Sequence, residues 1–249
     1  MEFVLNTDRE PHRHDFMTTQ WTIVRGAVAS SLDHRQRALE QLCGRYWMPL
    51  YAFLRRTGHS DHDSQDLVQG FFEQLLSKDF LKSVEQEKGR FRSFMLVAIK
   101  HYAAKERVRA NAQKRGGATK TLSIDYASAE DWYRIEPIDD VTPEMLYERR
   151  WALSLLDNVM NQLRQRFLDQ GKEELFDALK LHLVCDAEKL PYVQMAEKLT
   201  CSVESLKSTM HRLKGWYRDL LRAEIAQTVS PEEVADELQR LSNAISGNL

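Results

Sequence analysis

The sequence has little glycine, proline and cysteine for its length. Of 249 residues, 10 are glycine, 6 are proline and 3 are cysteine. Leucine, alanine, glutamate, lysine and arginine are abundant, and there are no runs of β-branched residues, which favours helix throughout the chain. The composition therefore predicts an all-α protein, with enough apolar residues for one large core or two small ones.

Long hydrophobic runs and closely spaced cysteines are also missing. No apolar stretch approaches the ~20 residues that span a bilayer, and the first residues become acidic too early for a signal peptide. Cys43, Cys185 and Cys201 lie far apart, with no pair at the spacing of a metal site. They are typical of buried thiols in a reducing compartment. We therefore expect a cytoplasmic protein without membrane contact.

Motifs of common enzyme classes do not occur. The sequence has no glycine-rich phosphate loop, no nucleophile elbow and no His-Glu-x-x-His. Metal-ligand residue types gather at His12–Asp15 and at His59–Asp63, but neither group has a third ligand at a suitable spacing. We predict that the protein is not an enzyme and that it uses neither a metal nor another cofactor.

Charge is nearly balanced overall but strongly segregated. The formal net charge of −2 argues by itself against a nucleic-acid-binding protein. Between Gly89 and Lys120, however, nine cationic residues accompany one acid, Glu106. The next segment, 121–148, has eight acids and one base. Blocks of opposite sign indicate separate surfaces with different roles.

Apolar periodicity and helix breakers divide the chain into segments. Gly116 and Gly117 end the basic helix, whereas Thr142 as a cap and Pro143 in the first turn begin a new one. A Ser-Pro-Glu-Glu helix start follows at Ser230. The predicted segments are an N-terminal extension (1–17), a first helical domain (18–115), an acidic linker (116–142), a second helical domain (143–229) and a C-terminal amphipathic helix (230–249).

The most specific local pattern is a helix-turn-helix at Pro191–Leu213. Small Ala196 lets the second helix approach the first, and Ser202 is the expected N-cap of the second helix. The outward face of that helix suits phosphates and guanine edges. It consists of Lys207, Ser208, His211, Arg212 and Lys214. A helical hairpin with a solvated basic face remains an open alternative.

Residues Tyr192–Leu221 resemble region four of bacterial sigma factors, which reads the minus-thirty-five promoter element. In that family a Tyr-x-x-x-Ala-x-x-Leu helix precedes a Ser-Val-x-x-Leu-Lys-Ser-x-x-His-Arg recognition helix. The resemblance implies that Lys207, Ser208, His211 and Arg212 contact this element. Thr200 departs from the family, which often has glycine there. Because a β-branched residue resists positive φ, we expect a different backbone in the turn.

The segment Asp63–Phe72 resembles the Asp-Leu-Val-Gln helix of sigma region two, which docks on the polymerase clamp. Its pattern places Asp66 and Gln69 on the face opposite the apolar stripe. Gly70 replaces a common glutamate and lowers helix propensity. The resemblance implies contacts with core polymerase by Asp63, Asp66, Gln69 and Phe72. A plain amphipathic helix with an acidic edge would show the same pattern.

The helix that begins at Phe91 resembles the part of region two that opens and captures the minus-ten element. Its aromatic residues, Phe91, Phe94 and Tyr102, fit a protein core better than base-stacking platforms. Its cations are suited to phosphates, and a flipped base needs a pocket. The implied DNA contacts are Lys100, Lys105, Arg107, Arg109, Asn111, Lys114 and Arg115.

The order of these segments resembles a sigma factor of the extracytoplasmic-function type from Thr18 to about Val229. The resemblance implies a protein that directs core RNA polymerase to promoter DNA and assists its melting. It also allows an anti-sigma or other regulatory protein as a partner. An operator-binding regulator that acts without polymerase would explain the second domain equally well, and a helical scaffold would explain only the apolar stripes.

Overall fold

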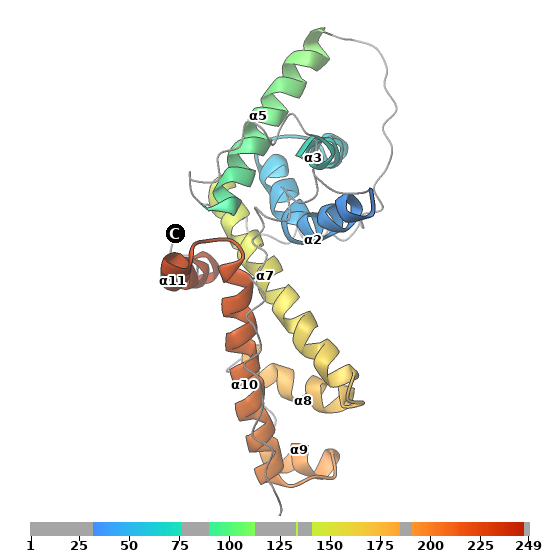
Figure 1. Cartoon of the computed structure of the whole chain (residues 1–249), viewed down its shortest axis with the longest axis vertical. Coiled ribbons are helices and arrows are strands. Elements are labelled where there is room, and N and C mark those ends of the chain that lie inside the picture. The colour runs from blue at the N-terminus through green and yellow to red at the C-terminus, as the bar shows by residue number, and fades with distance from the viewer. Residues whose placement is uncertain (1–31, 76–89, 113–132, 134–140, 185–190, 247–249) are drawn as a thin grey trace, which may run out of the picture.

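A computed structural model describes residues 32–75, 90–112, 133, 141–184 and 191–246 (Figure 1). Its helices are α2 (Leu32–Arg56), α3 (Asp61–Leu75), α5 (Phe91–Ala112), α7 (Pro143–Leu168), α8 (Glu173–Val184), α9 (Tyr192–Lys198), α10 (Val203–Ala226) and α11 (Val234–Ser246), with a 3-10 turn, η2 (Pro231–Glu233). These ranges contain no strand, which confirms the predicted all-α class. None of the helices within them is long and apolar enough to cross a membrane.

Two helices begin where the sequence predicts, because side chains satisfy backbone N–H groups that have no partner within the helix. The Thr142 hydroxyl accepts a hydrogen bond of 3.1 Å from the N–H of Met145 at the start of α7. The Ser202 hydroxyl accepts one of 3.1 Å from Ser205 at the start of α10. Both predicted caps are confirmed.

Helix α7 is the element around which the others assemble. Its most extensive contact is with α2, and it also packs on α8, α10 and α11. Tyr147 and Trp151 are buried near its start, and Leu163 and Phe167 are buried near its end. In Figure 1, α7 runs from the α2, α3 and α5 end of the molecule to α8. The described residues share one continuous apolar cluster, so the division into two domains remains a prediction.

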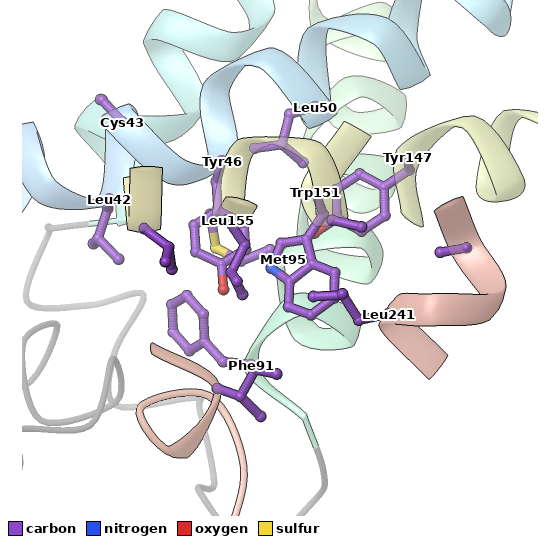
Figure 2. Packing of buried hydrophobic residues seen from close by; sticks show 14 of the residues in the cluster. Leu42, Cys43, Tyr46, Leu50, Phe91, Met95, Tyr147, Trp151, Leu155 and Leu241 are labelled. Carbon is purple, nitrogen blue, oxygen red and sulfur yellow. The ribbon is translucent and has the colours of Figure 1, made fainter. Parts of the chain in front are cut away.

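The part of this cluster at the α2, α3 and α5 end of the molecule contains aromatic and aliphatic side chains of α2, α5 and α7 (Figure 2). The rings of Tyr46 and Phe91 meet edge to face, with centroids 5.4 Å apart. Met95 is fully buried beside them. Cys43 lies at the edge of the cluster, where burial raises the pKa of its thiol to about 12. Cys201 is only half-buried, and Cys185 lies outside the described residues.

A glycine permits the close approach of α3 and α5. A β-carbon at Gly70 would lie 2.3 Å from the hydroxyl oxygen of Tyr102. The Tyr102 ring also packs against Phe71, with centroids 5.9 Å apart. Partial burial raises the pKa of Tyr102 to about 12. The glycine that lowers helix propensity in α3 is therefore needed for packing against α5.

Substituting Gly70→Ala should lower the free energy of unfolding by about 1 kcal/mol. Overpacking costs about 1–3 kcal/mol, and the better helix propensity of alanine offsets about 1 kcal/mol of that. Urea denaturation measures the change. In a Tyr102→Phe background, which lacks the hydroxyl that the new methyl group would meet, Gly70→Ala should cost less. An equal loss in both backgrounds would show that Tyr102 is not the cause.

Candidate nucleic-acid interface

The turn of the helix-turn-helix keeps a left-handed backbone at a β-branched residue. The N–H of Cys201 donates to the carbonyl of Ala196 at 3.0 Å, and the N–H of Thr200 donates to that of Glu197 at 3.3 Å. This pair of bonds is the Schellman pattern, which needs positive φ at the residue after the helix. Thr200 has a φ of +50°. The expectation of a different turn backbone is therefore wrong.

Glycine occupies the equivalent position at two other helix ends. Gly58 after α2 has a φ of +97°, and Gly171 after α7 has a φ of +66°. Both are followed by the same backbone bonds, from His59 to Leu54 and from Lys172 to Phe167. Thr200 adopts this conformation at a steric cost of about 1–2 kcal/mol that glycine avoids.

The recognition helix presents the face that the sequence predicts. Leu206, Met210 and Leu213 are buried on one side of α10. The exposed residues opposite include every predicted DNA contact of this helix, namely Lys207, Ser208, His211, Arg212 and Lys214. The Arg212 guanidinium donates to the Thr209 hydroxyl at 3.3 Å, which leaves the rest of its donors directed outward from the helix. The face is therefore accessible to a duplex.

The four cations from Lys100 to Arg109 in α5 are all exposed, and two of them are paired with acids. Lys105 and Arg107 are exposed. The Lys100 ammonium lies 2.6 Å from the Glu144 carboxylate, and its hydrogen bond to that group lowers the pKa of Glu144. Arg109 forms an ion pair of 2.9 Å with Glu106, one helical turn earlier.

Other predicted contacts of this helix are outside what the structure describes. This applies to the side chain of Asn111 and to Lys114 and Arg115.

Two exposed apolar residues of α5 were not predicted from the sequence. Val97 and Val108 keep 53% and 69% of their surface exposed. Their spacing of 11 residues, about three helical turns, places them on one face of the helix. The sequence alone could therefore have indicated this pair.

Helix α3 exposes a narrower surface than the sequence predicts. Asp63 and Asp66 are exposed, but Gln69 keeps only 5% of its surface exposed and Phe72 keeps none. The prediction that Gln69 faces away from the core is wrong. Helix α3 packs on both α2 and α5, so its buried face is wider than a single apolar stripe. Its exposed acids, Asp63, Asp66 and Glu73, form an acidic edge along the helix.

Residues of the group His59–Asp63, whose types suit metal ligands, form hydrogen bonds and an ion pair at the start of α3. Asp61 accepts hydrogen bonds from the Tyr51 hydroxyl at 2.8 Å and from Gln65 at 2.6 Å. His62 lies 3.2 Å from Asp66, and its pKa is raised by a hydrogen bond to its own backbone and by the Asp66 charge. In the described ranges no three His, Cys, Asp or Glu residues gather at a site fit for a metal ion.

The two cationic faces lie at opposite ends of the molecule (Figure 1). Helices α5 and α10 meet where the N–H of Phe91 donates to the carbonyl of Thr228 at 3.4 Å. From this joint each helix runs outward, for about 33 Å and 36 Å at 1.5 Å per residue. Exposed Lys105, Arg107 and Arg109 lie in the C-terminal half of α5, and the predicted DNA contacts Lys207, His211 and Arg212 lie in the N-terminal half of α10. The arrangement therefore suits two separate contacts.

The strain at Thr200 leads to a stability prediction. Thr200→Gly should raise the free energy of unfolding by about 1 kcal/mol, because the steric cost of positive φ exceeds the entropy that glycine loses on folding. Chemical denaturation measures the difference. Thr200→Ala, which keeps a β-carbon, should gain less. If Thr200→Gly destabilises the protein, the turn is not strained as described.

Comparison with known proteins identifies no relative of this chain. No protein-family model matches the chain, no curated protein matches it significantly, and no solved structure does so. The interpretation of the interface therefore depends on the residues, exposures and distances given above.

Proposed function

We propose that the chain is a sigma factor of the extracytoplasmic-function type, which directs core RNA polymerase to promoters and assists DNA melting. The observation that carries the proposal is the exposure of two cationic helix faces at opposite ends of one helical body (Figure 1). One of these faces belongs to a helix-turn-helix with a capped recognition helix. The sequence resemblance given above supports the same function.

The first step of the proposed activity is recognition of duplex DNA by α10. The exposed first half of the helix, Val203–Arg212, would enter the major groove, as recognition helices of this motif do. Arg212 would bind the O6 and N7 atoms of a guanine with two donors of its guanidinium. Lys207 and Lys214 would bind phosphates and fix the register on the duplex.

The second step is capture of an opened strand by α5. Lys105 and Arg107 would bind its phosphates. Val108, which keeps 69% of its surface exposed beside these cations, would contact bases that have lost their stacking partners. A surface that combines cations with apolar groups is suited to single strands without strict sequence preference.

The acidic edge of α3 supports a contact with core polymerase. Asp63 and Asp66 are exposed on a helix anchored by α2 and α5. Gln69 and Phe72 would act indirectly, because their burial keeps them from a partner surface. An operator-binding regulator without polymerase accounts for α10, but it leaves the α5 cations and the α3 edge without a role.

Transcription with purified core polymerase tests the proposed function. The chain and core are incubated with pooled genomic fragments, and the 5′ ends of the RNA products are mapped. The proposal predicts start sites that share two upstream sequence elements and that depend on the chain. Duplex binding that core polymerase does not alter, with no transcription, would favour the operator-binding alternative.

Arg212→Ala should weaken binding to the preferred duplex by about 1–3 kcal/mol and relax the preference for one base pair. The reason is the loss of a two-donor contact with a guanine edge. Competition binding against single-base variants of the duplex measures both effects. Arg222→Ala removes the same charge from an exposed site in the C-terminal half of α10 and serves as a matched control. Equal effects of the two substitutions would contradict the assigned role.

Lys105→Ala should reduce the slope of log affinity for a single strand against log salt concentration by about 0.7, the value for one phosphate contact on a single strand. Lys100→Ala should change the slope less, because a phosphate must compete with Glu144 for this ammonium group. Titrations at several salt concentrations measure both slopes. A larger change for Lys100→Ala would mean that the Glu144 ion pair opens when DNA binds.

A further inference from the structure

The C-terminal segment packs against the joint between α5 and α10. Helix α11 contacts α7 and α10, and its Leu241 and Ala244 join the apolar cluster. Figure 2 shows Leu241 beside Trp151 of α7. The segment begins with a capping box, in which the backbone N–H of Ser230 donates to the Glu233 carboxylate at 3.3 Å. It is therefore an ordered part of the fold, placed next to the start of the basic helix.

A carboxylate of α11 forms ion pairs with the first two cations of the basic run. Glu237 has no exposed surface. One of its oxygens lies 2.9 Å from Nε of Arg90, and the other forms an ion pair with Nη1 of Arg92. Arg92 also forms an ion pair of 2.5 Å with Glu148, and its guanidinium lies 4.5 Å from the centroid of the Trp151 ring.

Two guanidinium groups that converge on one anion, with an aromatic ring beneath one of them, are also well suited to bind a phosphate. Arginine binds carboxylates and phosphates through the same planar set of donors. Removing one partner of a buried ion pair leaves an uncompensated charge on the other. Once α11 moves away, another anion in the same place would therefore compensate the charges that Glu237 leaves.

We propose that Arg90 and Arg92 form a binding site for a nucleic-acid phosphate, and that Glu237 of α11 occupies this site as an intramolecular competitor. The inference rests on the proposed binding of DNA by α5. When α11 undocks, the cationic surface of α5 extends from Lys105 and Arg107 back to the start of the helix. The C-terminal segment thus limits the affinity of α5 for DNA until α11 is displaced.

Substitutions in the full-length chain that release α11 test this proposal. Gln239 is exposed in the interior of α11, where proline costs about 3 kcal/mol or more. Gln239→Pro should undock the helix, and Gln239→Ala at the same position is the matched control. Glu237→Gln is the second variant, since it removes the competing charge and keeps the size of the side chain. Hydrogen exchange at 90–95 and 234–246 reports release.

Binding of each variant to a short random-sequence single strand is then measured across salt concentrations. Gln239→Pro and Glu237→Gln should steepen the slope by about 0.7–1.4, an extra loss of about 3- to 7-fold between about 50 and 200 mM salt. Gln239→Ala should match the unmodified chain. Adding Arg90→Ala to Gln239→Pro should remove about half of the gain, because it deletes one of two phosphate contacts.

The proposal is overturned if α11 exchanges rapidly in Gln239→Pro while the slope stays unchanged, or if neither variant alters the slope. Failure of the proposed function gives a different result. In that case the unmodified chain does not support transcription with core polymerase, and the slopes measured on the random single strand still report whether Glu237 masks a phosphate site.

Discussion

Helix α7 has to bury apolar side chains against different neighbours along its length, and the rest of the structure depends on this constraint. Trp151 packs at the α2 and α5 end, whereas Phe167 packs against Phe176 of α8 and Trp216 of α10. These two residues of α7 are about 24 Å apart along the helix axis. The distance between the two cationic faces is therefore set by a continuous helix and by the joint of α5 with α10.

Local features could be predicted from the sequence because they depend on a few neighbouring residues. The caps at Thr142 and Ser202 and the outward face of α10 are such cases. The buried state of Gln69 was not predictable, since it depends on how many helices pack against α3. The conformation of Thr200 was not predictable either, because the chain on both sides of the turn imposes it.

The charge pattern of the sequence predicted the functional surface least completely. The sequence shows how many cations the basic run contains but not which of them have partners. The partner of Lys100, Glu144, is 44 residues away, and Arg92 is paired with acids of both α7 and α11. These pairings depend on tertiary packing. They pair several cations of the basic run with acids and give the C-terminal segment a proposed regulatory role.

Hydroxyl-radical footprinting of a promoter fragment, bound by the chain together with core polymerase, tests the central claim most directly. The account predicts two separate protected tracts on one fragment. Substitutions at Lys207 and Arg212 should remove protection from the upstream tract, and substitutions at Lys105 and Arg107 should remove it from the downstream tract. A single protected tract, the same with and without core polymerase, would contradict the account.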